Sequence, residues 1–238
     1  TNYQYRSGIV THAGYKWCVK GGKIYKSKWV TYKGNKYYFN KKGHAVRNGI
    51  KKIQKKYYYF NTNYQYRSGM ITHGGYKWYV KGGKIYKSKW VTYKGNKYYF
   101  NSRGHAVRNG IKTIKNKYYY FNTSYQYRAG LINHNGTYYY VTGGKFYKNT
   151  WKIINSKAYY FTSSGAAYKN RKITISGVVY NFGTTANTTH GYYTSGENRY
   201  FKDGNGNFLS GWKYVFGVKR LFSEDGILVS TGKNVIDI

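Results

Sequence analysis

Hydrophobic positions occur along this chain in short runs that are separated by glycine, asparagine or lysine. The runs are rich in aromatic and β-branched residues, as in Gly14–Val19, Gly34–Phe39 and Gln54–Phe60. Runs of this length and composition, broken by tight-turn residues, are typical of β-hairpins. Asn135-Gly136 is the strongest single hairpin signal among the breaks. The pattern predicts an all-β chain with almost no helix.

The runs recur with a period of 61 residues. Thr1–Gly8 returns as Thr62–Gly69, and residues 26–40 return unchanged at 87–101. Tryptophan holds the same place in every period, at Trp29, Trp90, Trp151 and Trp212. The periods are 1–61, 62–122, 123–183 and a degenerate 184–231, and we expect residues 232–238 to form a junction to a further domain.

Each period divides again into three units, which in the first period are 7–26, 27–47 and 48–67. A single hairpin cannot bury its own apolar face, so its stability must come from stacking on its neighbours. This partition predicts about 11 stacked hairpins.

Two of these units resemble a known repeat. Ser210–Gly226 and Lys28–Gly43 each carry a tryptophan, an aromatic or apolar second run and a closing glycine turn. In this they are similar to the cell-wall-binding repeats of the choline-binding and glucan-binding type. The resemblance implies an elongated β-hairpin solenoid with three hairpins per turn, which agrees with the 61-residue period.

In choline-binding relatives an aromatic cage between successive hairpins holds the ligand. The resemblance places such cages at Trp29 with Tyr37 and at Trp90 with Tyr98. Other units depart from the pattern, because isoleucine replaces the tryptophan at positions such as Ile50. The alternative for each of these aromatic residues is a place in the hairpin core.

The composition excludes several kinds of chemistry. The chain has 42 Lys+Arg but only 5 Asp+Glu, a formal net charge of +37, and residues 1–196 contain no carboxylate. Paired-carboxylate hydrolysis and a Ser-His-Asp triad therefore have no acid over most of the chain. The single cysteine, Cys18, forms no disulfide framework, and the six histidines lack metal-ligand spacing. We expect a binding module without catalysis, metal or cofactor.

Positive charge is concentrated in the first two periods. The net charges of the four periods are +15, +13, +8 and +1, so binding is expected mainly in residues 1–122. An excess of this size exceeds what solubility needs and favours a polyanionic partner. The predicted ligand-binding residues are Arg6, Lys33, Lys36, Arg47, Arg67, Lys94, Lys97, Arg108, Arg128, Trp29, Tyr37, Trp90, Tyr98, Trp151 and Trp212.

The partner that best suits such a chain is an anionic polymer of a Gram-positive wall, teichoic or lipoteichoic acid, bound by many weak phosphate contacts. A neutral α-glucan is the alternative, as in the repeats of a glucansucrase or an adhesin. Nucleic acid is a further rival, because basic grooves with aromatic residues bind single strands. The resemblance to wall-binding repeats disfavours nucleic acid.

The ends of the chain suggest a piece of a longer, secreted protein at the cell surface. The sequence shows no initiator methionine, no signal peptide and no membrane span. Val235–Ile238 is similar to the opening strand of the lysozyme-like muramidases of glycoside hydrolase family 25. That similarity implies that Asp237 begins a catalytic domain and that the parent is a peptidoglycan hydrolase.

Overall fold

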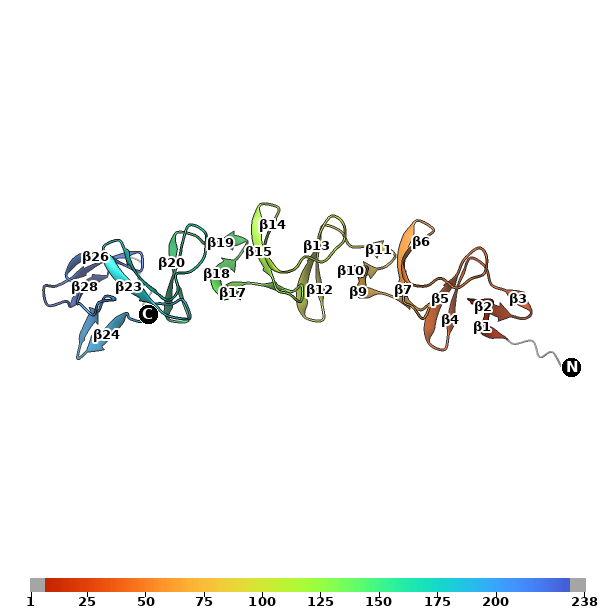
Figure 1. Ribbon diagram of the computed structural model, residues 1–238, viewed down its shortest axis with the longest axis horizontal. Helices are drawn as coiled ribbons and strands as arrows, with labels where there is room; N and C mark the ends of the chain where they lie inside the picture. The colour runs from red at the N-terminus through yellow and green to blue at the C-terminus, as the bar shows by residue number, and fades with distance from the viewer. Residues whose placement is uncertain (1–6, 232–238) are drawn as a thin grey trace. The chain divides into compact units, whose positions relative to one another are not determined.

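Short antiparallel hairpins make up the regular structure of the protein, as its computed structural model shows for residues 7–231 (Figure 1). The chain divides into two compact units. Unit 1 comprises Thr1–Arg108 with Thr123–Tyr127, and unit 2 comprises Asn109–Asn122 with Arg128–Ile238. Between residues 7 and 231 all assigned elements are strands, so no helix there could cross a membrane. The expected all-β class is confirmed.

Unit 1 contains five sheets of two or three strands. Its strands are β1 (Gly8–His12), β2 (Tyr15–Lys20), β3 (Lys23–Ile24), β4 (Lys28–Tyr32), β5 (Asn35–Phe39), β6 (Gly49–Ile53), β7 (Lys56–Phe60), β8 (Tyr66–Arg67), β9 (Gly69–His73), β10 (Tyr76–Lys81), β11 (Lys84–Ile85), β12 (Lys89–Tyr93) and β13 (Asn96–Phe100).

Unit 2 continues the same pattern, and β16 (Tyr127–Arg128) falls at the boundary of the units. Its strands are β14 (Gly110–Ile114), β15 (Lys117–Phe121), β17 (Gly130–His134), β18 (Thr137–Thr142), β19 (Lys145–Phe146), β20 (Thr150–Ile154), β21 (Lys157–Phe161), β22 (Arg171–Ile175), β23 (Val178–Phe182), β24 (Tyr192–Ser195), β25 (Asn198–Phe201), β26 (Gly211–Val215), β27 (Val218–Phe222) and β28 (Leu228–Thr231).

The strands repeat with the predicted period. β4, β12 and β20 begin 61 residues apart, as do β1, β9 and β17. Eleven separate small sheets lie within residues 7–231, each built on one hairpin. The predicted hairpin number and the three-hairpin period are therefore confirmed.

Two-residue loops close most of these hairpins. The loop between β4 and β5 is Lys33 and Gly34, with φ of 45° and 72°. Asn135 and Gly136 join β17 to β18 with φ of 51° and 79°. Two consecutive positive φ angles define the type I′ turn, whose twist matches that of the paired strands. The hairpin predicted at Asn135-Gly136 is present.

Large apolar residues near the end of each second strand form the core. In unit 1, Phe39, Phe60, Val80 and Phe100 have no exposed surface. Phe39 packs with the buried Cys18, and Phe100 packs in a separate cluster one period later. Full burial of such a side chain contributes about 1.5–3 kcal/mol. Because every cluster draws on more than one hairpin, the hairpins stabilise one another.

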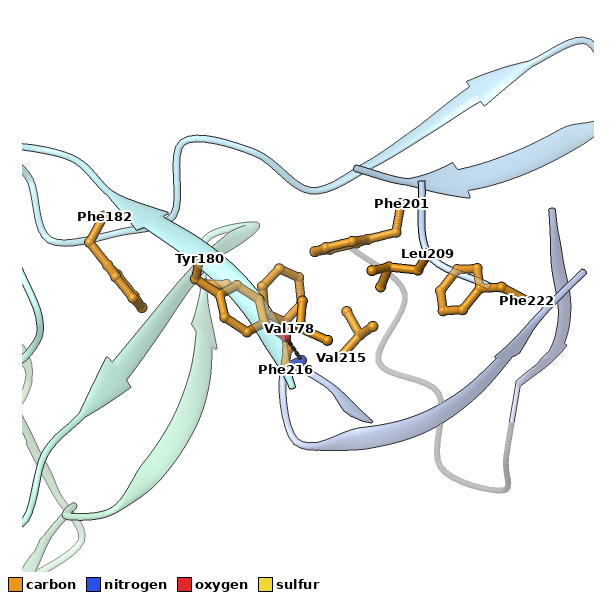
Figure 2. Close-up of a cluster of buried hydrophobic side chains, with 9 residues drawn as sticks. Val178, Tyr180, Phe182, Phe201, Leu209, Val215, Phe216 and Phe222 are labelled. Atoms are coloured by element: carbon orange, nitrogen blue, oxygen red, sulfur yellow. Dashed lines mark hydrogen bonds between the residues drawn. The ribbon is translucent and has the colours of Figure 1, made fainter. Parts of the chain in front are cut away.

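The largest cluster of unit 2 surrounds Tyr180 (Figure 2). The Tyr180 side chain is fully buried, and its hydroxyl donates a hydrogen bond to the Tyr214 carbonyl oxygen at 3.3 Å. The same hydroxyl accepts a hydrogen bond from the backbone N–H of Phe216 at 3.2 Å. Burial raises the pKa of Tyr180 well above its usual value of 10. These two bonds fix the turn between β26 and β27 against β23.

Candidate functional site

A tight turn follows the second strand of most hairpins, and glycine usually occupies one position in it. In the turn after β5, Gly43 has a φ of 89° and donates its N–H to the Asn40 carbonyl oxygen at 2.9 Å. The equivalent residue one hairpin later is Tyr64, which has a φ of 66° and makes the same bond to Asn61 at 3.0 Å. A bulky residue rarely adopts this left-handed conformation, which costs on the order of 1 kcal/mol or more. The turn alone therefore does not explain why a tyrosine occupies this position.

The Tyr64 ring lies close to two cationic side chains. The Lys16 ammonium is 5.6 Å and the Arg47 guanidinium carbon is 5.2 Å from the ring centroid. Tyr64 also packs on the buried cluster of Phe39, which limits the movement of its ring. An adjacent hollow of about 360 Å³ is lined by Lys16, Tyr64 and Ile9 among others. Two cations thus meet at one aromatic ring beside an open hollow.

This arrangement recurs one period later, also within unit 1. Tyr125 has a φ of 67°, and Lys77 and Arg108 lie 5.5 and 5.2 Å from its ring centroid. We call Lys16–Tyr64–Arg47 and Lys77–Tyr125–Arg108 the paired-cation sites. No acid precedes residue 197, so no carboxylate of unit 1 can neutralise them.

A third copy of this arrangement, 61 residues further on, is incomplete. The position of Tyr64 is taken by Ala186, which is fully buried and keeps a positive φ of 64°. Tyr138 replaces the lysine, and Lys169 replaces the arginine. The third copy therefore keeps one cation, Lys169, but lacks the tyrosine and the first lysine.

Aromatic side chains gather around Trp29, which was predicted to form a cage wall. Its ring centroid lies 5.2 Å from that of Tyr38, 4.8 Å from Tyr58 and 5.6 Å from Tyr66. The ammonium of Lys36 lies 5.1 Å from the Trp29 ring. A cation of the chain itself therefore approaches this tryptophan.

Lysine approaches tryptophan in this way in three of the four periods. The contacts are Lys36 over Trp29 at 5.1 Å, Lys97 over Trp90 at 5.1 Å and Lys219 over Trp212 at 4.7 Å. The third period has Ala158 at the lysine position, and Trp151 has no such contact among the described residues. Trp151 therefore differs from the other three tryptophans.

The pairing of Trp29 with Tyr37 that the resemblance implied is wrong. Trp29 lies opposite Tyr38 across the hairpin, whereas Tyr37 lies opposite Val30. Successive residues of a strand point to opposite faces, so Tyr37 packs in the cluster of Phe39 instead.

The pairing of Trp90 with Tyr98 is wrong for the same reason. Trp90 lies opposite Tyr99, while Tyr98 lies opposite Val91 on the other face.

Comparison with known families gives a match over four segments of the chain. Residues 27–45, 88–106, 111–124 and 149–167 match the family described as "Putative cell wall binding repeat". The chain therefore contains cell wall binding repeats. The matched segments include Lys28–Gly43, and the resemblance stated for that unit is confirmed.

Comparison with solved structures finds several that are similar to this chain. CbpJ from Streptococcus pneumoniae is 17% identical with a TM-score of 0.47, over 93% of this chain and 99% of that chain. The choline-binding domain of CbpL from Streptococcus pneumoniae is 21% identical with a TM-score of 0.49, over 80% and 100%. Alternansucrase in complex with isomaltononaose is 22% identical with a TM-score of 0.36, over 93% and 18%. A comparison with curated proteins gives no match. These similarities assign no ligand to this chain.

The other predicted residues of the repeats lie at separate places. Lys33 and Lys94 occupy exposed type I′ turns, each beside the tyrosine that precedes it. Arg67 donates hydrogen bonds to the Asn35 side-chain oxygen and is thereby held against the preceding hairpin. Arg128 is exposed, and so is half of Trp212. Arg6 and Asp237 lie outside the described residues. A binding role for all of these residues stays a prediction.

Histidine in these repeats packs against aromatic rings. His44 stacks on Tyr15 with a centroid distance of 3.8 Å, and His105 stacks on Tyr76 at the same distance. Residues 7–231 hold no cluster of three or more groups that could ligate a metal ion. Cys18 is buried, and desolvation raises the pKa of its thiol, which leaves it an unreactive core residue.

Sequence reasoning predicted Arg47 and Arg108 of these sites as ligand-binding residues but missed Tyr64 and Tyr125. The signal was present, because tyrosine stands where the same turn elsewhere has glycine, as at Gly43. It was hidden by the many other tyrosines of the chain.

Proposed function

We propose that this chain is a non-catalytic module that attaches its parent protein to anionic wall polymers, teichoic or lipoteichoic acid. The observation that carries the proposal is the repeated paired-cation site. Lys16 and Arg47 converge on one rigid ring, with no carboxylate in unit 1 to compensate them. Phosphate groups supply the missing negative charge and accept charge-assisted hydrogen bonds from lysine and arginine.

Affinity arises from the number of such contacts. A single exposed ion pair contributes about 1 kcal/mol or less. A polymer whose phosphates recur along a flexible chain engages several sites together, and the effective concentration multiplies their strength. The two paired-cation sites and the exposed turn lysines Lys33 and Lys94 all lie in unit 1, in the most basic part of the sequence.

A cationic ligand fits unit 1 poorly. The Lys36 ammonium approaches the ring of Trp29, where an external cation would have to bind. The net charge of +37 adds long-range repulsion. The aromatic clusters of unit 1 therefore support hairpin packing rather than capture of a quaternary ammonium.

Pull-down on purified walls, before and after teichoic acid removal, tests the proposal. We expect the full chain to bind intact walls, to release them with rising salt and to lose binding after removal. Binding that survives removal contradicts the proposed ligand.

A matched pair of variants tests the sites themselves. The site variant carries Lys16→Gln, Arg47→Gln, Lys77→Gln and Arg108→Gln. The control variant carries Lys23→Gln, Lys26→Gln, Lys84→Gln and Lys87→Gln. These four lysines are exposed and also form two pairs that are 61 residues apart, so the control loses as much positive charge as the site variant. We expect the site variant to bind at least tenfold more weakly than the control. Equal losses would show that net charge alone attracts the polymer.

A neutral α-glucan is the second candidate, and exposed aromatic residues in the fourth period favour it. Trp212, Tyr214 and Phe208 expose about half of their surface each. This period has a net charge of only +1, and aromatic faces stack on sugar rings without charge. Dextran binding that tolerates salt and depends on Trp212 would support this candidate.

The proposal extends to the parent protein. We place the module in a secreted, wall-associated protein, with a peptidoglycan hydrolase as the parent suggested by Val235–Ile238. Residues 7–196 contain no carboxylate, so the chain itself should show no muramidase activity. Turnover of peptidoglycan by the purified chain would contradict this assignment.

A further inference from the structure

Unit 2 contains a cavity of about 740 Å³ between successive hairpins. We call it the Trp151 cavity. Its lining includes Tyr140, Tyr147, Trp151, Lys152, Tyr192 and Arg220. A volume of this size holds a small organic ligand and exceeds what one ordered water needs.

Two features of the sequence keep this cavity open. Ala158 stands where the other periods have lysine, so no ammonium of the chain covers Trp151 among the described residues. Gly217 also lines the cavity, and a Cβ added there would lie only 3.2 Å from Cδ1 of Trp151. A larger residue at either position would reduce the space beside the tryptophan.

One wall of the cavity is rigid. Val215 and Phe216 line it and belong to the buried cluster of Figure 2. The backbone N–H of Phe216 is bound to the Tyr180 hydroxyl, which fixes the turn. The ring of Phe216 lies 5.1 Å from that of Trp151. A ligand would therefore meet a preformed wall.

Arg220 is the unusual residue of the lining, because its side chain is only 4% exposed. Its Nε donates a hydrogen bond to the Tyr192 hydroxyl at 3.4 Å, but its buried Nη1 has no partner. None of the carboxylates described in residues 7–231 forms an ion pair with Arg220. A buried guanidinium without a counter-charge is costly, and such groups normally pair with an anion.

The rest of the lining has matching chemistry. Lys152 brings a second cation, whose ammonium lies 4.2 Å from the Tyr147 ring centroid. No acidic residue lines the cavity. Aromatic side chains make up much of the remaining wall, and flat aromatic surfaces pack well against the apolar face of a sugar ring.

We propose that the Trp151 cavity binds a saccharide that carries a carboxylate or phosphate group. Arg220 and Lys152 hold the acidic group, and Trp151 with its neighbouring tyrosines contacts the sugar ring. This site lies in unit 2 and uses none of the paired-cation residues of unit 1. Its existence does not depend on the proposed polymer binding.

Indole N–H resonances of the full chain, followed by NMR, provide the test. Titration with glucuronate and with glucose 6-phosphate should shift the Trp151 resonance, which Trp151→Phe identifies by its loss. The two acids distinguish a carboxylate-bearing from a phosphate-bearing source, and saturable binding of either supports the site. Glucose should bind at least tenfold more weakly. An equal response to sodium chloride at matched ionic strength, or to glucose, overturns the proposal.

Three variants separate the cations from the fold. Arg220→Met removes the buried charge at similar volume, and we expect it to fold and to bind the acidic sugars at least tenfold more weakly. Lys152→Gln should weaken binding in the same direction, whereas Lys157→Gln on the same hairpin should leave it unchanged. If Arg220→Met fails to fold, the affinities of Lys152→Gln and Lys157→Gln for the acidic sugars are compared, and this comparison decides whether a cation of the cavity contributes to binding. Unchanged affinity in the cavity variants overturns the site.

Wall binding by the same variants keeps the two proposals apart. The Arg220→Met chain should retain pull-down on intact walls, because the paired-cation sites are unaltered. Loss of sugar binding with retained wall binding supports both assignments. Failure of wall binding in the unaltered chain contradicts the proposed function without affecting the NMR result.

Discussion

Replacing Tyr180 with phenylalanine tests how the hairpins of unit 2 are held together. The Tyr180 hydroxyl is fully buried between the Tyr214 carbonyl oxygen and the Phe216 N–H. The change Tyr180→Phe removes one oxygen atom and leaves the ring in place. It therefore reports on the two hydrogen bonds rather than on packing.

The expected cost comes mainly from one of the two partners. Phe216 is 7% exposed, so its N–H finds no water when the hydroxyl is lost. Tyr214 is half exposed, and its carbonyl oxygen is more easily solvated. An unsatisfied buried donor costs about 1–3 kcal/mol, so we expect the free energy of unfolding of unit 2 to fall by that amount.

Urea unfolding of the full chain, followed by tryptophan fluorescence, measures the effect. With a slope of about 1–3 kcal/mol per molar urea, the midpoint of unit 2 should fall by roughly 1 M. The matched control is Tyr159→Phe, because Tyr159 is 5% exposed and its hydroxyl makes no hydrogen bond within the described residues. A midpoint that falls no further in Tyr180→Phe than in the control refutes the reasoning.

The pH dependence gives a second measurement of the same residue. Because burial raises the pKa of Tyr180, the unfolded chain releases this proton first when the pH rises. The native state then binds more protons than the unfolded state, so stability falls as the pH rises above about 10. Tyr180→Phe should remove this contribution and flatten the alkaline limb.

Three further changes have expected outcomes. Burial lowers the pKa of His190, so the free energy of unfolding should decrease as the pH falls below about 6.5. His190→Gln should reduce this pH dependence, which urea titrations at pH 5 and pH 7 measure. Gly165→Ala places a Cβ that clashes with the edge of the Phe146 ring, whereas Gly177→Ala meets open space at a similar positive φ, so the melting temperature should fall more for Gly165→Ala. Glycine readily adopts the φ of 66° found at Tyr64, so Tyr64→Gly should keep the fold while weakening wall pull-down. Unchanged pull-down would contradict the proposed role of the Tyr64 ring in binding.

Much of the fold could be predicted because each hairpin carries its own local signals. The run Lys28–Phe39 shows β-branched and aromatic residues on both sides of Lys33-Gly34, and the structure forms β4 and β5 there. Exact repetition of this run at 89–100 extends the same argument to the second period. Local turn chemistry and periodicity thus determine where the strands lie.

The face on which each aromatic residue lies could not be predicted in the same way. Strand orientation is usually recognised from the alternation of apolar and polar residues. In Tyr37-Tyr38-Phe39 every residue is aromatic, so the alternation gives no sign of which ring meets Trp29. Only the pairing register resolves this, and it selects Tyr38.

The burial of Arg220 was hidden for a different reason. Arginine is among the residues least often buried, so sequence reasoning treats it as surface charge. Its burial depends on the packing of Tyr192 and the β26–β27 hairpin, which come from separate parts of the fourth period. Such a site requires three-dimensional contacts that no local pattern encodes.

Comparison among the periods connects the two sites to the distribution of charge. Tyr64 and its copy Tyr125 occupy this turn position where both a lysine and an arginine lie beside the ring, and Ala186 takes it, at a similar φ of 64°, where Tyr138 replaces the lysine. If these tyrosines served packing alone, their loss need not coincide with the loss of the lysine. In the third period, Ala158 stands in place of the lysine beside the tryptophan, and residues of the third and fourth periods line the Trp151 cavity. The two units therefore differ at separate repeat positions, because unit 1 holds the paired-cation sites and unit 2 holds an aromatic cavity with a buried arginine.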